Sequence, residues 1–309
     1  MAKINKNKNN YQSDTETSKN YKEIDLLQNL NFAVSCTDIK LTKNKNFLIS
    51  SGTYKPSVKI HDLNNLSFHL ERNLDCEIIK IQPLEDNHQK LALLRTDKRI
   101  EFHAKYGKHE TTNIDFFPRD IIFNRNTSEL FIIGKKILPL NLEDGRFETP
   151  IDIEAESIDI NPKHPLIGCT NSESLFFIDN RTKTHIKSLS YTNPTNIQFS
   201  NNGINFIIST DNKIIEHDLR STNPLNELTH NNITNIKYHN NKIISTSKET
   251  INLYNNHELE LQITDKNINK IENIEGIIAV GYDTGEIKTY YSELLGRIPQ
   301  WCTFVENVM

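Results

Sequence analysis

The chain has 309 residues, of which 36% are hydrophobic and 25% are charged, and its formal net charge is −4. This balance indicates a soluble globular protein and excludes the bulk electrostatics of a free-standing nucleic-acid binder. No apolar run approaches the roughly 18 residues of a membrane-spanning helix, and the first residues lack a signal-peptide pattern, so we expect neither membrane contact nor secretion.

Residues 1–20 are rich in Lys, Asn, Ser and Thr and have almost no apolar content, which predicts a disordered tail. Its lysines, Lys3, Lys6 and Lys8, could make a weak, salt-sensitive RNA contact. The many Asn residues between them favour a tail without a specific role.

From residue 21 to residue 291 the chain repeats itself. Groups of short apolar strands each close on an aromatic, His or Asp position followed by a turn, at intervals of roughly 36–41 residues, close to the length of a WD40 blade. Because no segment keeps a 3.6-residue apolar period, we expect almost no helix. The pattern predicts an all-β fold, a seven-bladed WD40-type β-propeller. Its seven anchors begin at Ile60, Glu101, Pro139, Phe177, Glu216, Leu253 and Tyr290.

The fifth and seventh units show how the blades are built. In the fifth, strands are expected at residues 195–199, 205–209, 213–217 and 225–228, separated by Asn, Gly and Asp turns. The seventh supplies only three strands, at residues 268–274, 276–281 and 286–291. We therefore expect residues 21–30, with the segment 23–27, to provide its fourth strand, which would remove the open sheet edges of the ring.

Residues 292–309 leave the last blade as a tail that we expect to pack on the propeller. The tail holds the only Trp of the chain, Trp301, with Phe304 three residues later. Burying a Trp stabilises a fold by a few kcal/mol, so packing of the pair on its own domain is favoured. If the pair is exposed instead, it would anchor a partner protein.

No motif in the chain indicates catalysis. The pairs His61–Asp62 and His217–Asp218 fall at strand ends of the repeat, and adjacent strand residues point to opposite faces, so we interpret them as structural. The 11 histidines show no paired-ligand spacing, and no nucleophile elbow or phosphate-binding loop is present. We predict a protein that is not an enzyme and has no cofactor, no metal site and no small-molecule substrate.

The 4 cysteines, Cys36, Cys76, Cys169 and Cys302, are far apart in the sequence. This spacing predicts reduced, mostly buried thiols in a cytosolic or nuclear protein, and not a zinc site or a disulfide framework.

Two basic clusters are candidate RNA contacts. Arg95, Lys98 and Arg99 should lie in the hairpin that enters the third strand of the second blade, and Lys105 with Lys108 and His109 follows. Such clusters are mostly solvated loops. Their functional interpretation is contact with RNA phosphates.

Two segments carry a family resemblance. Residues 52–59 begin Gly-Thr-Tyr-Lys-Pro, and residues 295–304 contain Pro-x-Trp-Cys-x-Phe. Both are similar to the nucleolar protein ten family, whose fungal member is known as essential nuclear protein two. The resemblance covers about residues 21–308. Further matches lie at residues 68–75, 99–103, 118–120, 141–147, 177–182 and 217–221.

The resemblance implies a nuclear, nucleolar protein of ribosome biogenesis, acting as a non-catalytic scaffold subunit of the small-subunit processome in pre-rRNA processing and small-subunit assembly. The implied partners are processome proteins, the U3 small nucleolar ribonucleoprotein and pre-ribosomal RNA. Because family members continue past the Trp-Cys tail, this chain is expected to be a reduced form without the C-terminal extension. The candidate partner or RNA contacts are Tyr54, Lys55, Arg72, Arg95, Lys98, Arg99, Arg119, Arg297, Trp301 and Phe304.

Two alternatives remain open. A generic WD-repeat adaptor that reads peptides, in ubiquitin ligation or chromatin, would show a polar or acidic pocket at the mouth of the central channel. A propeller hydrolase would need carboxylates or histidines that converge at the channel, whereas the inward-facing strand positions are expected to be aliphatic.

Overall fold

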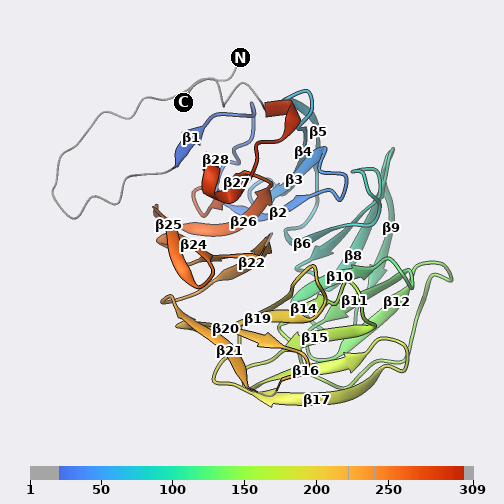
Figure 1. Ribbon diagram of the computed structural model, residues 1–309. Helices are drawn as coiled ribbons and strands as arrows, with labels where there is room; N and C mark the ends of the chain where they lie inside the picture. Colours follow the sequence, from blue (N-terminus) through green and yellow to red (C-terminus); the bar gives the residue numbers. More distant parts are fainter. Residues whose placement is uncertain (1–20, 222, 240, 303–309) are drawn as a thin grey trace.

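The computed structural model describes residues 21–221, 223–239 and 241–302. They form seven antiparallel four-stranded sheets arranged around a ring (Figure 1). The prediction of an all-β, seven-bladed propeller is therefore confirmed. In the described residues the helical elements are two 3-10 turns, Glu293–Leu295 and residues 300–302, and no helix is long and apolar enough to cross a membrane.

Each blade takes four strands, numbered here in chain order. Blade 1 comprises β2 (Cys36–Leu41), β3 (Phe47–Gly52), β4 (Ser57–Asp62) and β5 (Ser67–Asn73). Blade 2 comprises β6 (Ile78–Pro83), β7 (Leu91–Arg95), β8 (Arg99–Ala104) and β9 (Gly107–Asn113). Blade 3 comprises β10 (Asp120–Asn124), β11 (Glu129–Ile133), β12 (Ile137–Asn141) and β13 (Arg146–Phe147).

The remaining blades follow the same plan. Blade 4 comprises β14 (Ser157–Ile160), β15 (Leu166–Thr170), β16 (Ser174–Asp179) and β17 (Thr184–Ser190). Blade 5 comprises β18 (Asn196–Phe199), β19 (Asn205–Ser209), β20 (Lys213–Asp218) and β21 (Pro224–Thr229). Blade 6 comprises β22 (Asn235–His239), β23 (Lys242–Thr246), β24 (Thr250–Asn255) and β25 (Glu258–Thr264). Blade 7 comprises β26 (Ile268–Ile274), β27 (Ile277–Tyr282), β28 (Ile287–Tyr291) and β1 (Lys22–Ile24).

Burial of the strands follows their place in the blade. The second strands are almost entirely buried, as in β27, where all six residues are buried. Their runs of Ile, Leu and Val suit a position covered on both faces by neighbouring blades. The fourth strands are polar and mostly exposed, as in β17 with its sequence Thr-His-Ile-Lys-Ser-Leu-Ser. The core is thus a set of apolar layers between blades.

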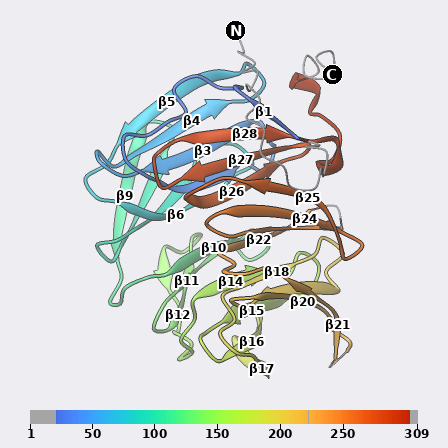
Figure 2. The same ribbon diagram turned by 90° about the vertical axis from the view of Figure 1, so that its left-hand side faces the viewer.

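Blade 7 is completed by the first strand of the chain. β1 pairs antiparallel with β28, with Lys22 opposite Tyr291 and Ile24 opposite Thr289. In Figure 1 the blue strand β1 lies beside the red strand β28, and Figure 2 shows blade 7 stacked between blades 1 and 6. The ring is therefore closed by hydrogen bonds between the two ends of the folded chain, and β1 covers the outer edge of β28 that three strands alone would leave open.

The first strands of all seven blades surround the central channel, each next to the first strand of the following blade, with β26 next to β2. Because the strands alternate in direction, the connections fall on two faces. We call the upper face the one that carries the links from second to third strand and from fourth strand to the next blade. The lower face carries the other two links.

The repeated anchors of the sequence coincide with irregular pairing. In blades 1, 2, 4, 5 and 6 the pairing of third and fourth strands shifts register at the anchor, as between Ile60 and His61 and between Glu216 and His217. His61 is buried and its Nε2 lies 3.1 Å from the carbonyl of Gln28. His217 stacks on Phe206 with ring centroids 5.3 Å apart. These histidines are packed inside the structure.

Candidate functional site

Most of the basic and aromatic candidates gather on the upper face of blades 1 to 3. Tyr54 and Lys55 lie in the β3–β4 connection, where the Tyr54 side chain is 75% exposed. Lys98 lies in the next blade, in the turn between β7 and β8, as the sequence predicted for this basic cluster. Arg119 immediately precedes β10 of blade 3 and is also exposed. We call these loops of neighbouring blades the upper patch.

An aromatic side chain that the sequence argument missed belongs to this patch. Phe117 lies in the connection from blade 2 to blade 3 and is 68% exposed. The Nζ of Lys98 lies 4.1 Å from the centroid of its ring, within the range of a cation–π contact. The signal was the doublet Phe116–Phe117, of which only Phe116 enters the core. An exposed ring beside a lysine is the combination that single-stranded nucleic acids use for stacking and charge contact.

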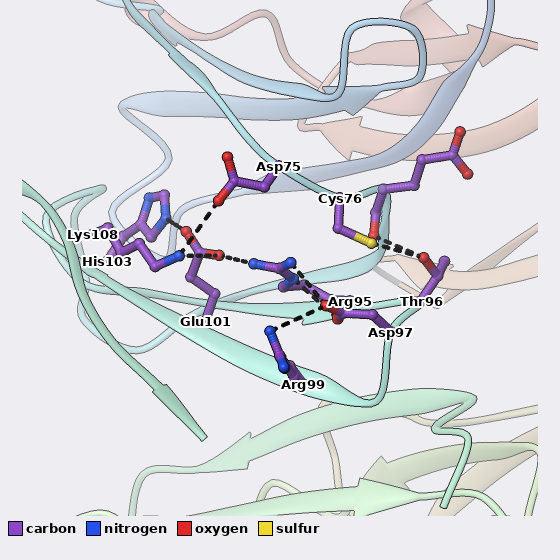
Figure 3. Close-up of polar contacts among 10 residues, drawn as sticks. Asp75, Cys76, Arg95, Thr96, Asp97, Arg99, Glu101, His103 and Lys108 are labelled. Carbon is purple, nitrogen blue, oxygen red and sulfur yellow. Dashed lines mark hydrogen bonds and ion pairs between the residues drawn. The ribbon is translucent and has the colours of Figure 1, made fainter. Parts of the chain in front are cut away.

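Arg95 is not available for such a contact. Its side chain is buried, and Nη1 donates to Oε2 of Glu101 at 2.5 Å. Nε and Nη2 donate to the two carboxylate oxygens of Asp97 at 3.1 and 2.8 Å (Figure 3). Burial alone would lower the pKa of Arg95, but the hydrogen bonds to Asp97 and Glu101 outweigh it and raise the pKa. The expectation that Arg95 faces a partner does not fit this geometry, and we leave it out of the interface.

Arg72 is also engaged within the protein. Its Nη1 lies 3.1 Å from Nδ1 of His103, and its Nη2 donates to the carbonyl of Lys105 at 3.1 Å. On the other side, Nε2 of His103 lies 2.8 Å from Glu101. A guanidinium can only donate, so Nδ1 accepts and the proton of the imidazole resides on Nε2. Burial, opposed in part by Glu101, lowers the pKa of His103 and favours this neutral form.

Glu101 is the centre of this network, which joins the outer parts of blades 1 and 2 (Figure 3). Besides Arg95 and His103 it contacts Lys108, whose Nζ lies 3.3 Å from Oε2. Burial alone would raise the pKa of Glu101, but the hydrogen bonds from His103 and Arg95 lower it. The buried carboxylate is therefore ionised and fully paired, and its role is structural.

Arg99 and Arg119 are exposed but have acidic neighbours. Nη1 of Arg99 lies 3.9 Å from Asp97. Arg119 contacts Glu154 at 3.0 Å and Glu156 at 3.1 Å. These exposed ion pairs contribute little free energy, so both arginines can exchange a carboxylate for a phosphate.

Two other candidates lie on the lower face, and one lies outside the described residues. Arg297 is exposed, while its carbonyl accepts the N–H of Gly276 at 3.1 Å. Trp301 is partly buried against the apolar cluster shared by blades 7 and 1, and Cys302 is buried. The described part of the tail is thus docked on the propeller. Phe304 lies outside the described residues.

The central channel differs from the sequence expectation. Inward-facing positions were expected to be aliphatic, but the first strands carry charged side chains that interact across the ring, such as Lys40 with Lys237 of blade 6. The expectation failed because the apolar members of these alternating strands face the neighbouring blades. The charged residues on the first strands are Asp38, Lys40, Lys80, Asp120, Asp159, Lys237, Lys270 and Glu272.

The charges in the channel are largely satisfied. Lys80 lies 3.4 Å from Asp120, and Lys237 lies 2.9 Å from Glu272. Burial raises the pKa of Asp159 to about 6, and its carboxylate accepts the N–H of Phe199. In the part of the chain that the structure describes, no three His, Cys, Asp or Glu side chains are grouped to hold a metal ion. The channel is therefore polar with mixed charge, and it does not separate the scaffold from the peptide-reader alternative, for which a polar or acidic pocket was expected.

The cysteines are placed largely as expected. Cys36, Cys169 and Cys302 are buried, and Cys76 is half-buried beside Thr96, with Sγ and Oγ1 3.2 Å apart. Burial raises the pKa of the Cys302 thiol to about 12, so this thiol is unreactive at neutral pH.

The seven four-stranded sheets around a channel define a β-propeller of the seven-bladed class. The whole chain, residues 1–309, matches the family model described as the Nucleolar protein 10-like, N-terminal domain. The chain belongs to this family.

Curated relatives share about a quarter of the sequence. The chain is 28% identical to Nucleolar protein 10 of Danio rerio, over 93% of this chain and 44% of the relative. It is 27% identical to Ribosome biogenesis protein ENP2 of Saccharomyces cerevisiae, over 92% of this chain and 44% of the relative. It is 28% identical to the Ribosome biogenesis protein enp2 homolog of Schizosaccharomyces pombe, over 97% of this chain and 54% of the relative. The chain thus spans about half the length of the curated relatives it matches.

Proposed function

We propose that this chain acts in ribosome biogenesis, in the nucleolus, as a non-catalytic scaffold subunit of the small-subunit processome. The observation that carries the proposal is the family match over the whole chain, together with relatives that are named for ribosome biogenesis. The finer role, in pre-rRNA processing and small-subunit assembly, would be exerted through processome proteins, the U3 small nucleolar ribonucleoprotein and pre-ribosomal RNA.

The geometry supports a scaffold over a catalyst. Polar groups that could serve in acid–base chemistry are engaged within the protein at two central places, where Glu101 is bonded to Arg95 and Glu272 is paired with Lys237. What the molecule offers to partners is a rigid ring with loops on two faces.

Within this role, we assign RNA contact to the upper patch. The exposed ring of Phe117 can stack on a base, while Lys55, Lys98, Arg99 and Arg119 can neutralise phosphates. The contact would be local, because the net charge of the whole chain is −4. Its affinity should fall with salt in proportion to the number of phosphates neutralised.

The role is tested by affinity purification of the tagged chain from nuclear extract, with sequencing of the RNA and identification of the proteins that come with it. Enrichment of U3 RNA, pre-ribosomal RNA and processome proteins is expected. Enrichment of ubiquitin-ligase or chromatin subunits without these RNAs would replace the proposal by the adaptor alternative. A chain that sediments only as a free monomer would contradict both.

The RNA contact is tested separately with purified protein and a labelled single-stranded RNA. We expect Phe117→Ala and Lys98→Glu each to weaken binding about tenfold, since stacking of one base on an aromatic ring is worth about 1–3 kcal/mol. The control is Lys248→Glu, because Lys248 is an exposed lysine in the equivalent turn of blade 6, between β23 and β24. Equal binding by all three variants would remove the upper patch from the proposal.

A further inference from the structure

A groove on the lower, outer side of the ring separates blades 2 and 3. It encloses about 610 Å³ and lies between the β8–β9 hairpin and the β12–β13 hairpin. Its size is within the range of cavities that bind small ligands or a few side chains of a peptide. The groove plays no part in the upper patch, which lies on the other face.

The floor of the groove is apolar and only partly covered. Leu84, Phe102, Phe123 and Leu142 line it, and each packs on the apolar layer between blades 2 and 3 while remaining partly exposed. Tyr106, at the tip of the β8–β9 hairpin, is 75% exposed at the edge. Apolar side chains left open in this way favour a partner that covers them.

The two walls of the groove are built differently. The fourth strand of blade 3, β13, spans only Arg146–Phe147, whereas β9 on the opposite side spans Gly107–Asn113. After β13 the chain stays on the edge of β12, where the N–H of Glu148 donates to the carbonyl of Pro139 and Ile151 pairs with Ile137.

The charges at the groove define the partner. Glu110 on the blade 2 wall and Glu143 on the blade 3 wall are both exposed, and no Lys or Arg among the described residues lies within 4 Å of either carboxylate. Glu143 accepts a hydrogen bond from the hydroxyl of Ser128 at 2.7 Å, which leaves its negative charge in place. The one lysine of the lining, Lys90, is paired with Glu85 at 2.7 Å. Two unneutralised carboxylates thus face an apolar floor from opposite sides, which complements cations on a ligand.

Two further grooves between blades are lined differently. In the groove of about 290 Å³ between blades 4 and 5, Asp179 and Asp218 are held by Arg181 and Arg220. The cleft of about 1230 Å³ between blades 5 and 6 is lined mostly by Ser, Thr, Asn and His side chains. The groove between blades 2 and 3 differs from both because its two walls place Glu110 and Glu143 on opposite sides of an apolar floor.

We propose that the groove between blades 2 and 3 binds an extended peptide segment of a partner protein, in which bulky apolar residues adjoin Lys or Arg. The apolar residues occupy the floor formed by Phe102 and Phe123, and the cations lie against Glu110 and Glu143. This site adds a protein-docking function that does not depend on RNA contact or on the processome assignment.

The probe is a phage-displayed library of short random peptides, panned on the immobilised full chain without RNA. Enriched peptides are expected to carry Leu, Ile or Phe next to Lys or Arg. Synthetic copies should bind at least about tenfold more weakly to the double variant Glu110→Lys, Glu143→Lys, because attraction becomes repulsion at two positions. The matched control is Glu258→Lys, since Glu258 is exposed on β25, the fourth strand of blade 6.

Tyr106→Ala provides a second variant that does not change charge, and it should weaken the same peptides. Tyr106, Glu110 and Glu143 are all exposed, so the melting temperatures of the variants should match that of the parent chain. If the double lysine variant does not fold, the double variant Glu110→Gln, Glu143→Gln replaces it. The proposal is overturned if no peptide is enriched, if the enriched peptides lack basic residues, or if the groove variants bind them with the same affinity as the parent chain. Purification from nuclear extract can succeed or fail independently of this result.

Discussion

The carboxylate of Asp38 accepts the backbone N–H of Ile81 at 2.8 Å, so a side chain of blade 1 is bonded to the first strand of blade 2. The arrangement recurs where Asp159 accepts from Phe199 at 2.6 Å and where Gln198 accepts from Tyr238 at 2.7 Å. Polar residues of the inner strands therefore join successive blades around the channel. They supply partners for backbone groups that adjacent sheets would otherwise leave unpaired.

Replacement of Asp38 should measure this contribution. Asp38 is 2% exposed, and Asp38→Ala would leave the N–H of Ile81 without its acceptor at a cost of about 1–3 kcal/mol. Asp38→Asn, which keeps an acceptor oxygen, should cost less. Chemical denaturation monitored by circular dichroism gives both values. Equal stability of the parent and Asp38→Ala would show that the bond has no net effect.

Acid should loosen the first blade through His61. Burial lowers the pKa of His61 to about 4, although the hydrogen bond to the Gln28 carbonyl acts in the opposite direction. His61 is protonated below about pH 6.5 in the unfolded chain but only below about pH 4 in the folded chain. The free energy of unfolding therefore falls as the pH decreases from about 6.5 to about 4, by up to about 3 kcal/mol.

His61→Gln can still donate to Gln28 and should reduce the slope of unfolding free energy against pH in that range, while the slope that remains comes from other histidines with a lowered pKa, such as His103 and His217. His185→Gln, at an exposed position of β17, should leave it unchanged. A slope of unchanged size in His61→Gln would assign the acid sensitivity to the other histidines.

Docking of the tail depends on the absence of a side chain at Gly276. A Cβ at this position would lie 2.7 Å from the carbonyl oxygen of Gly296 and 2.9 Å from that of Arg297. Gly276→Ala should therefore displace the tail and expose Trp301, the only Trp in the chain. Its fluorescence emission should shift to longer wavelength. Glu275→Asn, a change in the same turn, should leave the emission in place.

The closing strand should be indispensable. Ile24 is 5% exposed and packs in the cluster shared by blades 7 and 1, so Ile24→Ala should cost about 2–5 kcal/mol. Deletion of residues 21–30 should unfold or aggregate the protein. Asp25→Ala, at the exposed neighbouring position, is the control. A cooperative melt at unchanged temperature after the deletion would contradict the role of β1 in closure.

Much of the fold could be predicted from the sequence, because the repeat is visible in short segments that each form one strand. The fifth blade was expected at residues 195–199, 205–209, 213–217 and 225–228, and its strands lie within one residue of these bounds. In blades 1, 2, 4, 5 and 6 the anchor coincides with a register shift between the third and fourth strands, as at His61 and His217.

The surface was harder to predict because sequence proximity does not show which charges neutralise each other. Arg95 and Arg99 belong to one basic cluster in the sequence, yet only Arg95 turns inward to Glu101. Phe117 was passed over because its neighbour Phe116 explains the apolar doublet. In β2, polar and apolar residues alternate, and this pattern alone does not show whether Lys40 or Ile39 faces the central channel.

Ring closure sets an order of events during synthesis. The hydroxyl of Thr289 donates to the carbonyl of Ile24, which precedes it by 265 residues. The ribosome therefore makes β1 long before its partner β28, and blade 7 is completed only when nearly all of the described chain has emerged. Until then the growing polypeptide is an open arc with unpaired strand edges, which makes chaperones that shield nascent chains a natural requirement for its production.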